Sequence, residues 1–391
     1  MAVDWIWLIF IFVLGACVGS FLNVVIYRLP RGKSLVSPPS ACPACGKPIR
    51  FYNNIPLISW LVLKGRCSDC SAPISCRYFI IELLTSLLFG GVYLWFFWFE
   101  YRQTGLPGST PIEKFFTGGW LFYLVVITLA AAFLAASAVD LEMWIIPLEI
   151  CWFSTMVGLA GAAIAPFLIH QGYALEKLFP SAAYSPKIAA LTVGAALGLL
   201  VSLAGLYLGI IKPSYEIQEQ QEDHGHPDKE KPEPQFDDRK EILKEVIFLL
   251  PVVIGAFSVL KVTQMPAISE KWCSIIGYPV ISGLLGALAG YFAGCAVVWI
   301  TRILGTLAFA KEAMGLGDVH LMGAAGAVIG AKWVLLAFFL APFLGILWAL
   351  YQAFFQKIRQ IPYGPFLSIA VFSVIIFHDW IQRVLTDFYG F

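Results

Sequence analysis

Two acidic residues stand at the edges of apolar segments in a chain that is 59% hydrophobic and only 13% charged. Asp140 closes the stretch AASAVD, and Asp318 follows two glycines in MGLGD. An ionisable group at such a boundary is a functional candidate, because charge is costly near lipid. Two carboxyl groups brought together share a proton, so one can act as general base on water and the other as general acid. The sequence therefore predicts a carboxyl pair able to hydrolyse a peptide bond, with Gly315 and Gly317 leaving room for a substrate.

Other interpretations of these acids stay open. Acids are common at helix ends, and Glu142 is a competing acid beside Asp140. Asp140 and Asp318 could belong to a non-enzymatic zinc-ribbon membrane scaffold, or to a transporter-like protein in which they relay ions. Loss of peptide cleavage on changing either aspartate to asparagine favours the enzyme, and cleavage that survives both changes favours the scaffold.

Four of the nine cysteines form two CxxC pairs, within CPACGKPI and CSDCSAPI. Two such knuckles can present four thiolates to zinc in a tetrahedron. Four sulfurs leave no open position for water, so the zinc is expected to be structural. The alternative is two disulfides, which a reducing cytoplasm disfavours. The predicted metal ligands are Cys42, Cys45, Cys67 and Cys70.

Membrane helices are expected to position these residues. Apolar runs of about 20 residues cross a bilayer as helices, since a helix satisfies its own backbone hydrogen bonds in lipid. We expect an all-α polytopic membrane protein with about ten transmembrane helices and a small cytoplasmic zinc-ribbon-like domain. The predicted spans are 5–27, 79–99, 120–139, 148–169, 188–211, 246–262, 279–304, 319–330, 332–355 and 364–377.

The same pattern predicts how the chain is divided. The predicted parts are the first transmembrane helix 1–27, the cytoplasmic zinc-binding domain 28–77, a membrane region 78–187 with Asp140, a two-helix insertion 188–262 with a charged cytoplasmic loop 212–245, and a membrane region 263–391 with Asp318. Five basic residues follow the first span, so the positive-inside rule predicts a cytoplasmic segment 28–77 and an outer N-terminus. Counting spans then brings both acids to the cytoplasmic face. We expect no cleavable signal peptide, because the first apolar run lacks a basic start and is long.

Five blocks follow one another along nearly the whole chain in the order of one known family. They are GSFLNVVIYRLPRG (19–32), the cysteine-rich stretch 42–82, Asp140 with Ile146–Pro147, EAMGLGDVHLMGAAGAVIG (312–330) and IPYGPFLSIA (361–370). Together they resemble the type IV prepilin peptidases, which are GxGD membrane aspartyl proteases and N-methyltransferases. The chain differs from that family's usual pattern at His320, where lysine is usual, at Leu148, where aspartate is frequent, and at Phe79, where proline is common.

The resemblance implies that Asp140 and Asp318 are catalytic and that the four cysteines bind zinc. It implies cleavage of prepilin or pseudopilin leaders at the cytoplasmic face of the bacterial inner membrane. It also implies N-methylation of the new N-terminal residue with S-adenosylmethionine. The sequence assigns no residues to that cofactor, since it has no trustworthy nucleotide-binding signature. A peptidase that has lost methylation therefore stays an alternative. We expect the substrates and the lipid bilayer as partners, and no nucleic acid.

Overall fold

The computed structural model describes residues 2–100, 108–170, 185–212, 238–355 and 362–389. Over these ranges the chain is helical, apart from loops and two isolated β-bridges. Short 3-10 or π segments are η1 (Leu29–Arg31), η2 (Phe51–Asn53), η3 (Leu94–Trp98) and η4 (Phe115–Gly119). The α-helices are α1 (Ala2–Arg28), α2 (Ile58–Val62), α3 (Cys76–Tyr93), α4 (Pro111–Lys114), α5 (Trp120–Met143), α6 (Leu148–His170), α7 (Pro186–Tyr207), α8 (Asp238–Thr263), α9 (Pro266–Ile276), α10 (Pro279–Phe309), α11 (Leu316–Ile329), α12 (Ala331–Phe355), α13 (Gly364–Ile376) and α14 (His378–Tyr389).

The predicted fold class is confirmed: the chain is an all-α multi-pass membrane protein. Among the described residues, seven helical spans are long and apolar enough to cross a bilayer, and α13 with α14, bent by 77°, would make an eighth. Helices also cover the other two predicted spans, but α11 and the apolar part of α12 (Ala331–Ile346) are shorter. The count of about ten crossings therefore stays a prediction. Most of the charged loop 212–245 lies outside the described residues.

Glycines let three helix pairs approach each other closely. A methyl group at Gly198 of α7 would lie 2.1 Å from the carbonyl oxygen of Pro251 in α8. A methyl group at Gly290 of α10 would lie 2.0 Å from the carbonyl oxygen of Gly326 in α11. Lipid offers little hydrophobic drive for helix association, so such close packing of small residues is what holds membrane helices together. The glycine pairs at spacing four are Gly15 and Gly19 facing α3, Gly194 and Gly198 facing α8, and Gly290 and Gly294 facing α11.

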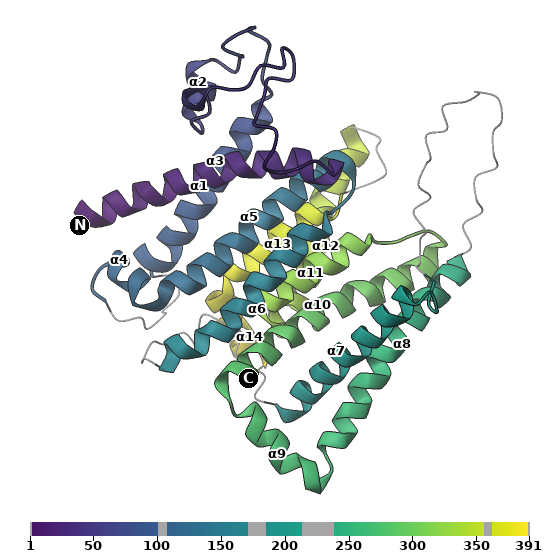
Figure 1. Cartoon of the computed structure of the whole chain (residues 1–391). Helices are drawn as coiled ribbons and strands as arrows, with labels where there is room; N and C mark the ends of the chain where they lie inside the picture. The colour runs from purple at the N-terminus through teal and green to yellow at the C-terminus, as the bar shows by residue number, and fades with distance from the viewer. Residues whose placement is uncertain (1, 101–107, 171–184, 213–237, 356–361, 390–391) are drawn as a thin grey trace, which may run out of the picture.

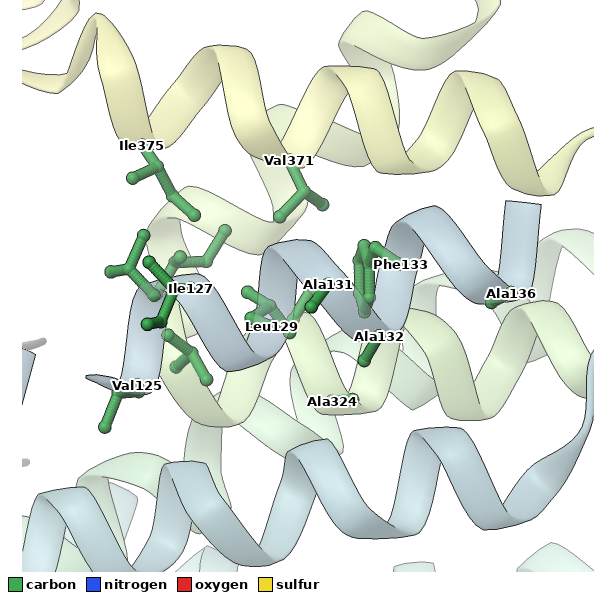
Figure 2. Packing of buried hydrophobic residues seen from close by; sticks show 14 of the residues in the cluster. Val125, Ile127, Leu129, Ala131, Ala132, Phe133, Ala136, Ala324, Val371 and Ile375 are labelled. Atoms are coloured by element: carbon green, nitrogen blue, oxygen red, sulfur yellow. The ribbon is translucent and has the colours of Figure 1, made fainter. Parts of the chain in front are cut away.

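Helix α5 runs through the middle of the bundle. Figure 2 shows Val371 and Ile375 of α13 pointing toward α5 from one side, with Ala324 of α11 on the other. The contact side chains of α5 include the small residues Ala131 and Ala132, so both neighbours come close to its backbone. Because Asp140 lies in the last turn of α5 and Asp318 in the first turn of α11, this packing sets where the two acids lie.

Two further parts flank this centre (Figure 1). The pair α1 and α3 lies on one flank, and the segment 28–77 with α2 extends beyond the ends of these two helices. The hairpin of α7 and α8 lies on the other flank against α10, and α9 joins α8 to α10. The predicted insertion 188–262 is therefore a packed part of the bundle over the residues that the structure describes.

Candidate active site

Helix α5 presents Asp140 near its end, in a place fixed by another helix. The side chain of Asp140 is buried, with 7% of its surface exposed. Its Oδ2 accepts a hydrogen bond of 3.0 Å from the backbone N–H of Gly364, the first residue of α13. A methyl group at residue 364 would lie 2.8 Å from the same oxygen, so this contact requires glycine. Helix α5 then ends at Trp144, which adopts a left-handed conformation with φ 58°.

Asp318 lies in the first turn of α11, where the helix dipole favours a negative charge. The carboxyl group is buried and lies beside Gly315, the residue that caps the helix, with its Oδ2 3.7 Å from where a methyl group at residue 315 would be. A methyl group at Gly317 would lie 2.6 Å from Cβ of Ile146. Glycine is therefore needed at residue 317 so that the turn after α5 can pack against the start of α11.

The structure brings together the helix ends that carry the two predicted acids. Ile146 packs against Gly317 on α11, and its Cδ1 would lie 3.2 Å from a methyl group at Gly364 on α13. Gly364 in turn contacts Asp140. The charge of Asp140 acts on the buried carboxyl of Asp318, and Arg302 is a further charged group that does so. Two neighbouring carboxyl groups favour the state in which they share one proton. This arrangement can supply one general base and one general acid.

The competing acid, Glu142, has a different partner. It forms an ion pair with Arg77 at the start of α3, and about a third of its side chain is exposed. The pair links the end of α5 to the base of the segment 28–77. Glu142 therefore has a structural role, because it joins α5 to the segment 28–77.

We expect Glu142→Gln to slow peptide cleavage by less than about tenfold, because a partly exposed ion pair contributes only about 0.2–1 kcal/mol. The measurement is the initial cleavage rate of the purified variant beside that of Asp140→Asn. Equal loss in the two variants would mean that the acid of α5 has been assigned to the wrong residue.

The four cysteines form one cluster of free thiols. Their sulfur atoms all lie within 4.8 Å of one another, and those of Cys42 and Cys70 are 3.8 Å apart. A zinc tetrahedron with bonds of about 2.3 Å has edges of about 3.8 Å, so the spacing fits a metal bound by four sulfurs. The two knuckles repeat each other, with β-bridges joining Ala41 to Pro48 and Arg66 to Pro73.

Backbone N–H groups also stabilise the thiolate form of one of the four cysteines. The backbone N–H groups of Cys45 and Ala44 lower the pKa of the Cys42 thiol, whereas burial and the neighbouring cysteines raise that of Cys70. A metal binds the thiolate, so this geometry suits a ligand. A four-sulfur cluster with no open position would hold a loop-rich segment together.

The three differences from the family pattern lie close to these sites. His320, in α11, has its Nδ1 3.3 Å from the hydroxyl of Tyr291, and its ring lies 5.8 Å from that of Trp152. Phe79 packs on Trp60 of the segment 28–77, with ring centroids 5.1 Å apart. Leu148 begins α6 and is exposed.

Gly364 and Arg302 had no predicted role, although both belong to the site. Gly364 lies within the stretch IPYGPFLSIA, where a glycine beside two prolines marks a backbone constraint but does not identify its partner. Arg302 is fully buried in α10. An arginine inside an apolar run is itself a signal for function, and the predicted span 279–304 contains one.

The fold and the two sites define a polytopic helical membrane protein with paired carboxyl groups at one end of its bundle and a four-cysteine segment beside them. Two family models match the chain: the bacterial peptidase A24 N-terminal domain over residues 13–96, and the type IV leader peptidase family over residues 237–350. The chain belongs to the type IV leader peptidase family, which is a family of proteases.

Curated relatives agree with this assignment. The chain is 24% identical over 407 residues to the prepilin leader peptidase/N-methyltransferase of Aeromonas salmonicida, covering 97% of this chain and 94% of the relative. It is 43% identical over 159 residues to the protein of the same name from Myxococcus xanthus, covering 40% of each chain. A match of 45% identity to the Neisseria gonorrhoeae protein of that name covers 20% of this chain and 36% of the relative. No solved structure matches the chain.

The matched regions cover the sites unequally. The N-terminal model includes the four cysteines, and the second model includes Asp318 and α8. Asp140 lies between the two regions that the family models match. The alignment to the Aeromonas relative spans 97% of the chain but does not single out Asp140. Its assignment therefore depends on the contacts described above.

Proposed function

We propose that this chain cleaves the leader peptides of type IV prepilins or pseudopilins, with Asp140 and Asp318 as its catalytic pair. The observation that supports the proposal is the burial of two carboxyl groups at the adjoining ends of α5 and α11. The names of the relatives support the substrate class. Buried acids without a function would be a costly feature of a membrane protein.

The proposed reaction uses the pair as base and acid. One carboxylate takes a proton from water, whose oxygen attacks the carbonyl carbon of the scissile peptide bond. The protonated partner then gives its proton to the leaving nitrogen as the carbon–nitrogen bond breaks. The hydrogen bond from Gly364 fixes Asp140, and the first turn of α11 fixes Asp318, so neither acid has to be ordered during the reaction.

We place this reaction at the cytoplasmic face of the bacterial inner membrane. Basic residues such as Arg31 and Lys33 follow α1, which supports a cytoplasmic segment 28–77. The ion pair of Arg77 with Glu142 joins that segment to the end of α5 that carries Asp140. We assign zinc to the four cysteines as a structural metal that keeps the segment folded beside the acids.

The proposal extends to N-methylation of the new N-terminal residue, because the relatives carry this activity in their names. The methyl donor would be S-adenosylmethionine, which supplies an electrophilic methyl group. Among the described residues, Oδ1 of Asn23 and Nε of Arg77 are buried and have no hydrogen-bond partner. Asn23 on α1 donates to the carbonyl of Tyr78, so these atoms lie near the base of the segment 28–77. They offer an acceptor and a donor that fit the polar groups of such a cofactor.

The product of the reaction tests this proposal. Purified chain is incubated in detergent with a purified prepilin, with and without S-adenosylmethionine, and the product mass is measured. We expect the loss of the leader in both samples and the gain of one methyl group only with the cofactor. No leader removal from any prepilin or pseudopilin would favour the scaffold interpretation. Leader removal without methylation would favour a peptidase that has lost the second activity.

A further inference from the structure

Arg302 is a fully buried arginine in α10, about two turns before the helix ends. Removing a guanidinium from water is costly unless its charge and its hydrogen-bond donors are all matched. An arginine in this position therefore needs a complete set of partners. Those partners come from two separate parts of the chain, helix α8 and the loop 310–315.

The first partner is Glu245 of α8, which is buried as deeply as Arg302 itself. Its Oε1 lies 2.7 Å from Nε of Arg302, and both side chains are at most 2% exposed. Its other oxygen, Oε2, accepts a hydrogen bond of 3.2 Å from the indole N–H of Trp299. The ring of Trp299 in turn stacks on Phe248 of α8, with centroids 5.5 Å apart. The carboxylate is thus held at both oxygens.

The other partners lie in the loop 310–315, which leads into the GxGD stretch. Nη1 of Arg302 donates to the carbonyl oxygen of Met314 over 2.5 Å. Nη2 lies 3.0 Å from a carboxyl oxygen of Glu312. Met314 is followed directly by Gly315, the cap of α11, and Asp318 lies in the first turn of that helix. One guanidinium therefore joins α8 to the residue next to the cap of the catalytic helix.

We propose that Glu245 and Arg302 are positioning residues that hold the loop 310–315, and through it Asp318, in the geometry that cleavage needs. The α7–α8 hairpin is then part of the active-site scaffold, because it supplies the glutamate that orients the arginine. The catalytic consequence rests on the proposed function, whereas the holding of the loop does not. The planar fork of arginine is essential to this role, since a lysine ammonium cannot contact Glu245, Met314 and Glu312 in the same way.

The test compares Glu245→Gln with Glu241→Gln. Glu241 lies about one turn earlier on α8 and pairs with Lys244, so its loss removes an acid from the same helix and leaves Glu245 in place. The first readout is the rate at which trypsin cuts after Lys311, an exposed residue of the loop, followed by mass spectrometry of the detergent-solubilised chain. We expect cutting to be roughly tenfold faster in Glu245→Gln and Arg302→Lys, because local opening exposes the loop. Glu241→Gln should match the wild type.

The second readout is steady-state cleavage of prepilin. Glu245→Gln should lower kcat about tenfold with little change in KM, which is the result expected when a group is misplaced without loss of substrate binding. Trp299→Phe keeps the ring that stacks on Phe248 but removes the donor to Glu245. It should give a smaller change in the same direction, and it serves as the test if Glu245→Gln fails to fold.

Two outcomes separate this proposal from the proposed function. Trypsin cutting at Lys311 that stays at the wild-type rate in Glu245→Gln, or in Trp299→Phe if that variant is used, overturns the positioning role whatever the peptidase assay gives. Faster cutting at Lys311 in a chain that never cleaves prepilin supports the holding of the loop and overturns only the peptidase.

Discussion

Replacing Asp318 with asparagine should abolish leader cleavage while leaving the protein folded. Asparagine has nearly the same shape and keeps a polar oxygen in the first turn of α11, so the start of the helix stays in place. It cannot exchange a proton in the way the reaction needs. General acid–base catalysis contributes about 10²–10⁴-fold to a rate, and we expect a loss at the upper end of that range or beyond. The measurement is cleavage of purified prepilin in detergent.

Asp140→Asn should also abolish leader cleavage while leaving the protein folded. The amide oxygen of asparagine can still accept the hydrogen bond from Gly364, so α13 keeps its contact with α5. Asp140→Ala would leave that buried N–H unsatisfied and cost about 1–3 kcal/mol of stability, which would confuse loss of chemistry with loss of structure. Asparagine is therefore the informative substitution. Normal elution and unchanged zinc content are the controls for folding.

Cys42→Ser and Cys67→Ser should each release the metal and unfold the segment 28–77. The described part of this segment has two isolated β-bridges and short helical turns, and it has little apolar core of its own. A structural zinc site contributes on the order of 10–16 kcal/mol to the folding of such small domains. Elemental analysis should give about one zinc per chain in the wild type and much less in each variant. Limited proteolysis should cut 28–77 rapidly only in the variants.

The matched control for the zinc prediction is Cys76→Ser. Cys76 is an exposed thiol at the start of α3 and lies outside the cluster of four sulfurs. This variant should keep its zinc and its resistance to proteolysis. Full zinc content in Cys42→Ser, or a wild-type protein without zinc, would contradict the assignment of these ligands.

Local patterns predict the residues of the two candidate sites but not the contacts between them. The CxxC pairs and GxGD are short-range patterns, and their meaning depends on spacing of a few residues. The hydrogen bond from Gly364 to Asp140 joins residues 224 positions apart, and nothing in either neighbourhood specifies the partner. The contacts of Arg302 with Glu245 and Met314 likewise join separate helices and loops, and no local pattern specifies them. A buried arginine can be noticed in the sequence, but its partners depend on helix packing.

The spacing of glycines in the sequence indicates which helices pack closely, and apolar runs alone do not. Glycines at spacing four in α1, α7 and α10 mark the faces that approach α3, α8 and α11. Span counting treats these helices as equivalent, because hydropathy carries no information about neighbours. Hydropathy also cannot decide whether a helix as short as α11 crosses the bilayer, since its 14 residues are fewer than the roughly 20 that a full crossing needs.

The central claim, that Asp140 and Asp318 act as one catalytic unit, is tested most directly by single-turnover cleavage rates of four proteins. These are the wild type, Asp140→Asn, Asp318→Asn and the double variant, each assayed on the same purified prepilin at the same pH. If the acids form one unit, each single substitution removes what both together remove, because the effects of such residues are not additive. We therefore predict that the three variants share one residual rate. A single variant that cleaves at near the wild-type rate, or a double variant much slower than either single one, would contradict the pair.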